Sequence, residues 1–309
     1  MKNIFGSVHY NSIGSWLRKE FNCQISKLAF DGGFTCPNRD GTKGIGGCIF
    51  CGGDGAGHFS STIDESQSQV QLLSRKWPNG KYIAYFQSFT STYDHPDNLR
   101  KKYEEALQVP DVMGLAIATR PDCLSPKVLE VIKEFSERTF LWIELGLQSI
   151  HNKTAMLTNR CYSTDTYDRA VESLDKLDIR IVTHLIFGLP GETRKDMMES
   201  AIHIAKQTPF GIKLHQLYLM EGTPLFENNY LKDMLSFGSE ESYIDLVVDV
   251  LEILPQSVTI HRLTGDAPTD RLLAPLWAKD KRSILNGIQQ EFKKRGTFQG
   301  IHSPSLPSL

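Results

Sequence analysis

The chain alternates between short apolar runs that suit β-strands and longer segments with the apolar spacing of α-helices. Strand-like runs are ISKLAF (25–30), YIAYFQ (82–87), VMGLAIA (112–118), FLWIELGLQ (140–148), RIVTHLIFG (180–188), IKLHQLYL (212–219) and VTIHRL (258–263). The clearest helix is SPKVLEVIKEFSER (125–138), where Ser125 can cap and Pro126 suits the first helical position. Similar helical patterns cover 163–177, 192–207 and 239–254.

Regular alternation of strands and helices predicts parallel strands joined by right-handed crossovers. We therefore expect an α/β fold, a partial (β/α) barrel of about six parallel strands with N- and C-terminal extensions. No linker or low-complexity segment interrupts the pattern. We expect one domain over 1–309, with a core at about 25–220 and a C-terminal extension at about 221–309.

Polar, unusual sequences follow several of the predicted strands. A glycine-rich loop (31–61) follows the first strand, and QSFTSTYD (87–94), TRPD (119–122) and GLPGET (188–193) follow the second, third and fifth. Ligand sites in parallel α/β folds form at the carboxyl ends of the strands. The sequence therefore predicts that these segments converge on one active site.

Three of the six cysteines lie in the glycine-rich loop, as Cys36, Cys48 and Cys51. Without a secretion signal, such cysteines indicate metal or redox chemistry rather than disulfides. One interpretation is a zinc site of three cysteines and His58 that holds the loop together. The other is a 4Fe–4S cluster held by three cysteines, which leaves one iron free of protein ligands. The position at the predicted active edge favours the cluster.

Further motifs follow in order along the chain, including ELGLQS (144–149), TNR (158–160), GLPGET (188–193), GTPL (222–225) and HRLTGDAP (261–268). Together with the cysteine loop, this order resembles the radical S-adenosylmethionine (SAM) superfamily. It is most similar to the branch of the Elongator catalytic subunit and the small stand-alone YhcC/YtqA-type proteins. The resemblance implies an enzyme in which a 4Fe–4S cluster on Cys36, Cys48 and Cys51 binds SAM. An electron from a low-potential donor then cleaves SAM to a 5′-deoxyadenosyl radical, which abstracts a substrate hydrogen.

The resemblance also implies residues that bind SAM. Glu144 would accept hydrogen bonds from the ribose hydroxyls, and strand alternation places it on the face opposite Leu141, Ile143 and Leu145. A structural salt bridge is the alternative for this buried carboxylate. Arg160 would bind the SAM carboxylate, or else be an exposed helix-edge arginine.

The remaining SAM contacts are expected after strands two and five. Gly188 and Leu189 would approach the adenine, although GLPGET could be an ordinary turn between a strand and a helix. Gln87 or Ser88 would contact the SAM amino group, because the usual glycine-glycine-glutamate motif is missing here. Catalytic residues beyond these are not identified.

Other residues with chemical potential have simpler interpretations. Cys161 stands where the resemblance leads us to expect glycine, and it has no assigned role. The predicted strands also contain histidines that we interpret as core residues and a lysine that could line the substrate cavity, namely His184, His215, His261 and Lys213.

The net charge of −2 indicates neither a nucleic-acid nor a membrane partner, but the charge is unevenly distributed. Seven basic and two acidic residues lie between Arg271 and Arg295, on a helix predicted over 270–296. This helix is either a solvated face or a footprint for phosphates. Together with the resemblance, it indicates a tRNA substrate and modification of the wobble uridine.

Three hypotheses follow for the function. The first is a radical SAM enzyme acting on tRNA, the second is one acting on a small metabolite or a peptide, and the third is a zinc-stapled, non-enzymatic RNA-binding protein. No apolar run is long enough to span a membrane, and we expect a cytoplasmic protein.

Overall fold

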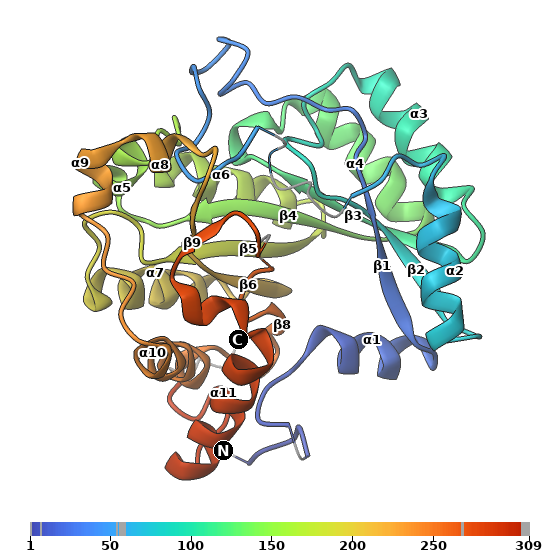
Figure 1. Ribbon diagram of the computed structural model, residues 1–309. Helices are drawn as coiled ribbons and strands as arrows, with labels where there is room; N and C mark the ends of the chain where they lie inside the picture. Colours follow the sequence, from blue (N-terminus) through green and yellow to red (C-terminus); the bar gives the residue numbers. More distant parts are fainter. Residues whose placement is uncertain (1, 7, 54, 56–59, 267–268, 304–309) are drawn as a thin grey trace.

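The computed structural model describes residues 2–6, 8–53, 55, 60–266 and 269–303. Its main feature is one sheet of seven parallel strands in the order β1-β2-β3-β4-β5-β6-β8 (Figure 1). The strands are β1 (Ile25–Phe30), β2 (Lys81–Phe86), β3 (Val112–Thr119), β4 (Phe140–Gln148), β5 (Arg180–Phe187), β6 (Gly211–Gln216) and β8 (Thr259–Arg262). The prediction of a partial (β/α) barrel is confirmed, with each predicted run supplying a strand.

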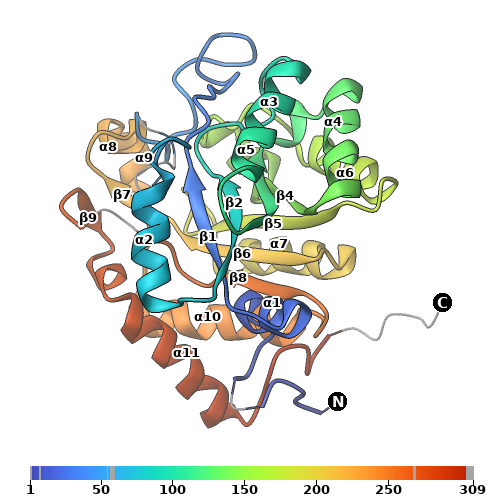
Figure 2. The ribbon, with the colours of Figure 1, turned by 90° about the vertical axis from the view of Figure 1, so that its right-hand side faces the viewer.

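Helices cover the outer face of the curved sheet (Figures 1 and 2). They are α2 (Ser66–Lys76), α3 (Pro96–Leu107), α4 (Pro126–Arg138), α5 (Asn152–Leu157), α6 (Thr164–Asp175), α7 (Arg194–Gln207), α10 (Glu240–Ile253) and α11 (Lys281–Arg295). Their ends follow the predicted capping rules: Ser125 accepts a hydrogen bond from the Val128 amide, and Thr193 with Asp196 forms a capping box. A large apolar layer fills the space between these helices and the sheet.

The inner face of the sheet is closed at one end by helix α1 (Ile13–Phe21), which contacts both edge strands, β1 and β8. Leu17 of α1 packs against a second apolar cluster that contains Trp142 and Val182. Within β4, Leu141, Ile143 and Leu145 join the outer layer, whereas Trp142 joins the inner one. The predicted alternation of β4 is thereby confirmed, and the inner face of the half-barrel remains for polar residues further along the strands.

The C-terminal segment differs from the prediction of one helix over 270–296. Leu272–Ala274 forms strand β9, which pairs with β7 (Leu219–Met220), and a 3₁₀ turn follows at Leu276–Lys279. Helix α11 begins only after Asp280, whose side chain accepts a hydrogen bond from the Ser283 amide. Proline at 275 and this cap interrupt the helix, because proline lacks the amide that a helix interior needs.

Two short helices follow β7, α8 (Pro224–Glu227) and α9 (Asn229–Asp233), and a 3₁₀ turn at Pro121–Cys123 follows β3. In the described part of the chain, no helix combines the length and apolarity needed to cross a membrane.

Candidate active site

The cysteine loop leaves the carboxyl end of β1 and is anchored over the neighbouring strand ends. Ile49, between two of the cysteines, packs in an apolar cluster with Leu189, Leu217, Leu225 and Leu231. Its amide donates to the Thr158 carbonyl (3.1 Å), and its carbonyl accepts from the Leu225 amide (2.9 Å). Burying an isoleucine contributes about 2 kcal/mol, so this residue fixes the Cys48–Cys51 turn on the barrel.

Two asparagines join the cysteine loop to the segment after α5. The Asn159 side chain donates to the carbonyls of Ile45 (2.9 Å) and Gly47 (2.8 Å). The fully buried Asn38 side chain donates to the Asn159 carbonyl (2.5 Å) and lies 3.6 Å from the Cys48 sulfur. The TNR motif is therefore a support for the cysteine loop, a role that the sequence did not reveal.

Close packing between these segments requires small residues. A Cβ on Gly44 would come within 2.0 Å of Asn38 Oδ1 and 2.8 Å of Cys161 Sγ. Cys161 itself is exposed and has a φ of 64°, in the left-handed region that favours glycine. The backbone thus agrees with the expectation of glycine at this position. The Cys161 sulfur lies 3.6 Å from the Asn159 carbonyl oxygen and 3.4 Å from Asn159 Oδ1, and these contacts with the described residues assign the thiol no chemical role.

Arginines surround the three cysteines. Arg39 donates to the carbonyls of Cys51 (3.2 Å) and Gly52. A hydrogen bond from Cys48 lowers the pKa of the Cys51 thiol, and the positive charge of Arg39 acts in the same direction. The same hydrogen bond, together with burial, raises the pKa of the Cys48 thiol well above its usual value. Iron and zinc are bound by thiolates, so in the metal-free protein Cys51 is the thiol of this pair that is closer to the metal-binding form.

The zinc interpretation requires His58 as the fourth ligand, and this residue lies outside the described residues. The side chains of Cys48 and Cys51 are within hydrogen-bonding range of each other. Among the described residues, one group of three possible ligands has all its donor atoms within 4.8 Å of one another, and it is His151, Asp196 and Glu199, not the three cysteines.

Two further arginines lie on the ring of Tyr162, at the ends of β3 and β4. The guanidinium of Arg120 is 4.8 Å from the ring centre and that of Arg160 is 4.5 Å. Arg120 also pairs through two 2.9 Å hydrogen bonds with Asp122. Both arginines are buried, so they hold positive charge at the edge where an anionic ligand group would be stabilised.

The guanidinium of Arg160, predicted to bind the SAM carboxylate, already donates hydrogen bonds to backbone carbonyls. Its guanidinium donates to the carbonyls of Leu147, Ser149 (2.6 Å) and Tyr162 (3.0 and 3.1 Å). It is therefore a buried support for the end of β4 and not an exposed helix-edge arginine. Binding of the SAM carboxylate by this side chain stays a prediction.

Glu144 is at the centre of a polar network on the inner face of the half-barrel. Its carboxylate accepts from Trp142 Nε1 (2.9 Å) and lies 3.3 Å from Lys27 Nζ and 2.9 Å from His184 Nε2. It also pairs with Lys213 of β6, which lies 2.8 Å from the Tyr85 hydroxyl. The salt bridge expected as the alternative is thus present, and the contact with the SAM ribose stays a prediction.

Charge in this network is set by burial and close partners. Burial alone would raise the pKa of Glu144, but the ammonium groups of Lys213 and Lys27 outweigh it and hold the pKa well below its usual range. Burial, reinforced by the charge of Lys213, lowers the pKa of His184 to about 4. The carboxylate is therefore ionised and the imidazole is neutral at pH 7. His215 and His261 lie on β6 and β8 as predicted, and Nε2 of the first and Nδ1 of the second have no hydrogen-bond partner among the described residues.

The other predicted SAM contacts lie at the ends of β5 and β2. Gly188 has a φ of 83°, and a Cβ there would come within 2.8 Å of Gln216 Nε2. Leu189 is buried against the cysteine loop through Ile49, so its side chain is a packing residue and only its backbone could face a ligand. Ser88 is buried and lies 2.9 Å from the Ser60 hydroxyl, while Gln87 is half-buried at the same edge.

A half-barrel with three cysteines at its carboxyl edge defines a class of iron–sulfur enzymes. The Radical SAM superfamily matches residues 36–204, and the Radical SAM C-terminal domain matches 209–294. The chain belongs to the radical SAM superfamily, whose members are enzymes that use a 4Fe–4S cluster and SAM.

Individual relatives agree with this family. The chain is 44% identical to YtqA of Bacillus subtilis over 296 residues, covering 94% of this chain and 92% of that protein. It is 28% identical over 177 residues to a tRNA uridine(34) acetyltransferase of Methanocaldococcus infernus, covering 54% of this chain and 32% of that protein. In fold it resembles the Elp3 structure from the same archaeon, with a TM-score of 0.66, 18% identity and coverage of 89% of this chain and 64% of the other.

The residues of this chain suit the cofactors of the family. Cys36, Cys48 and Cys51 would hold the cluster on the supported loop, leaving one iron without a protein ligand. When bound, the cluster supplies the electron that cleaves SAM. The chain itself supplies fixed positive charge through Arg120 and Arg160 and an ionised carboxylate in Glu144. Because these groups are buried, they are oriented before a ligand arrives.

Proposed function

We propose that this protein is a radical SAM enzyme that modifies the wobble uridine of tRNA. The observation that carries the proposal is the similarity, over about half of the chain, to a protein named tRNA uridine(34) acetyltransferase. Likeness of family does not fix a substrate, so the proposal depends on the site as well. A low-potential reductant is the electron donor that this chemistry requires.

The geometry supports specific roles for the predicted residues. Cys36, Cys48 and Cys51 hold the cluster, and Glu144 accepts hydrogen bonds from the SAM ribose in exchange for one of its present donors. Its four donors come from β4 itself and from three other strands, so a change of partner is readily accommodated while charge stays balanced. Arg160 with Gly188 completes the SAM site at the ends of β4 and β5.

The predicted basic helix supports RNA binding less than its sequence suggests. Arg295 of α11 pairs with the carboxylates of Asp245, Asp249, Glu252 and Glu291. Lys294 and Lys281 are paired as well. The remaining cations without an ion pair among the described residues are Lys279, Arg282 and Lys293. Arg295 thus neutralises carboxylates of α10, while Lys294 and Lys281 neutralise Glu291 and Asp266, so these three cations are less available to phosphates.

Mass spectrometry of tRNA nucleosides from cells with and without the gene tests the proposal. We expect one modified nucleoside to disappear and its precursor to accumulate, and the wild-type gene to restore the pattern. A copy with Cys48→Ala should not restore it. An unchanged nucleoside profile would overturn the tRNA proposal and favour a metabolite or peptide substrate, provided that the purified protein still cleaves SAM.

A further inference from the structure

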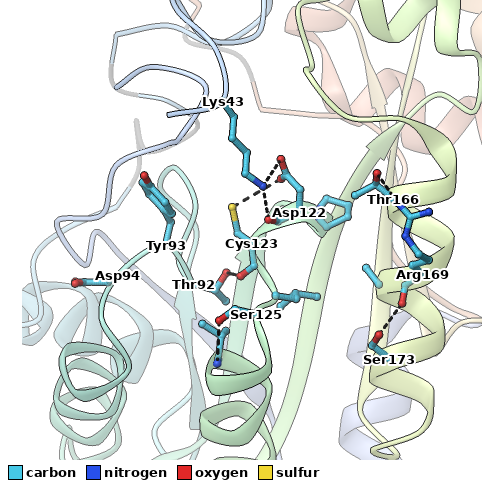
Figure 3. A pocket seen from close by; sticks show the side chains of 14 residues that line it. Lys43, Thr92, Tyr93, Asp94, Asp122, Cys123, Ser125, Thr166, Arg169 and Ser173 are labelled. Atoms are coloured by element: carbon cyan, nitrogen blue, oxygen red, sulfur yellow. Dashed lines mark hydrogen bonds and ion pairs between the residues drawn. The ribbon is translucent and has the colours of Figure 1, made fainter. Parts of the chain in front are cut away.

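A cleft of about 620 Å³ lies on the outer side of the half-barrel, beside the cysteine loop (Figure 3). Its walls are the segments that follow β2 and β3, the first turn of α4 and one side of α6. Lys43, from the cysteine loop itself, reaches down to its rim (Figure 3). The cleft therefore adjoins the active edge without being part of the cofactor site described above.

The lining of the cleft is part apolar and part polar. Its apolar residues are Pro121, Leu124, Val128 and Ala170, and we call them the apolar floor. The aromatic ring of Tyr93 and the side chains of Ser125, Thr166 and Ser173 line it as well. An apolar floor with an aromatic neighbour suits a flat base, because bases of single-stranded RNA stack on such surfaces.

Positive charge exceeds negative charge around the cleft. Asp122 is shared by Arg120 (2.9 Å) and Lys43 (3.0 Å), so two cations balance one carboxylate. Asp94 is paired with Lys102 at 3.2 Å. Arg169 of α6 is exposed and forms no ion pair with the described residues, its guanidinium donating only to the Thr166 hydroxyl at 3.3 Å. Because Asp122 and Asp94 are already paired with other cations, the guanidinium of Arg169 is available to bind a phosphate in the cleft.

The N-terminus of α4 adds to the positive potential at the cleft. The first turn of this 13-residue helix lines the cleft through Ser125 and Val128, whereas α6 borders it along one side, from Thr166 to Ser173. The positive end of a helix dipole favours an anion. Cys123 in the wall offers no competing chemistry, because burial raises the pKa of its thiol to about 12.

We propose that this cleft binds one nucleotide of the RNA substrate, next to the nucleotide that reacts. Its base would lie on the apolar floor beside Tyr93, and its phosphate would contact Arg169 and Lys43. The inference rests on the proposed function, since it requires an RNA substrate. The cleft would give the RNA a contact surface outside the cofactor site, a role for which α11 is less suited because several of its cations are in ion pairs.

Binding of a fluorescent anticodon stem-loop RNA to the reconstituted, cluster-containing protein tests the cleft. Arg169→Gln should weaken binding about tenfold at low salt and lower the slope of log K against log [salt] by about 0.7 to 0.9. Ser173→Trp, which fills the cleft, should weaken binding without changing that slope. Lys176→Gln is the matched control, because Lys176 is exposed just after α6, pairs with Glu172 and lies outside this cleft.

A rival surface is tested in the same assay with Arg282→Gln of α11. All variants should cleave SAM at the wild-type rate without RNA, because none of these residues belongs to the cofactor site. If wild type and Arg169→Gln bound the RNA with equal affinity and only Arg282→Gln bound it more weakly, the assignment of the cleft as an RNA site would be wrong. The tRNA proposal would be unaffected. Absence of stem-loop binding together with unchanged cellular nucleosides would overturn both.

Discussion

The half-barrel and the cysteine loop meet at the same edge, yet their backbones are fixed by different interactions. Seven paired strands and two apolar layers hold the half-barrel, and a buried polar network on its inner face is centred on Glu144. In the loop, the described contacts include two antiparallel bridges, side-chain amides and two buried apolar anchors, Phe34 and Ile49. The difference implies that changes in the loop should abolish cofactor binding and spare folding, whereas changes in the barrel should affect folding first.

The largest effect is expected from removing a thiol. Cys36→Ala, Cys48→Ala or Cys51→Ala should each lower the rate of SAM cleavage at least about a hundredfold, because an iron loses its ligand. The melting temperature of the metal-free protein should change little, because these half-buried thiols are not part of the apolar core. Anaerobic assay of 5′-deoxyadenosine, with Cys23→Ala as control, measures the first quantity and calorimetry the second. Normal 5′-deoxyadenosine release by a cysteine-loop variant would contradict the assignment.

The barrel should respond in the opposite way to Glu144→Ala. The variant leaves the buried ammonium group of Lys213 and the half-buried one of Lys27 without their carboxylate, which should lower the free energy of unfolding by about 3–5 kcal/mol. Denaturant unfolding measures this loss. Glu144→Gln keeps the shape and isolates the charge, and a loss below about 1 kcal/mol in both variants would show that the network does not stabilise the barrel.

Acid should also distinguish the two regions. His184 has a folded pKa of about 4 and an ordinary value of 6.5, so below pH 6.5 the unfolded chain binds a proton that the folded chain does not. Its stabilising contribution is present above pH 6.5 and is lost as the pH falls toward 4, by up to about 3 kcal/mol. His184→Gln should flatten the decline in unfolding free energy over this range, whereas the exposed His302→Gln should not. Equal slopes in wild type and His184→Gln would mean that the buried imidazole is not the cause.

The smallest effect is expected from Asn159→Gly. Glycine accepts the φ of 51° at this position but removes the donors to the Ile45 and Gly47 carbonyls, a loss of about 1–2 kcal/mol to the loop alone. Iron bound after reconstitution should fall, while the unfolding of the barrel stays within experimental error of wild type. Asn152→Gly, at the other end of α5, is the control. If Asn159→Gly lowered the stability of the barrel but left the iron content normal, the proposed separation between loop and barrel would be contradicted.

The strands of the half-barrel and the three cysteines could be predicted from the sequence, whereas the contacts that support the loop and surround Glu144 could not. The strands were recoverable because β-branched and apolar residues repeat with a clear period, and the cysteines because their spacing in a glycine-rich loop is distinctive. The roles of Asn38 and Asn159 were not recoverable, since hydrogen bonds between residues 121 positions apart leave no local pattern. Likewise, three of the four partners of Glu144 come from other strands, namely Lys27, His184 and Lys213. The predicted C-terminal helix is too long because apolar spacing continues across Pro275.

The central claim is that the three thiols hold a 4Fe–4S cluster with one iron open to SAM. Electron paramagnetic resonance of the reduced, reconstituted protein tests it most directly, with and without SAM. We predict an iron content near four per chain and a change in the spectrum when SAM is added, because SAM becomes a ligand of the open iron. A spectrum that SAM leaves unchanged, or a colourless protein with one zinc and no iron, would contradict the account.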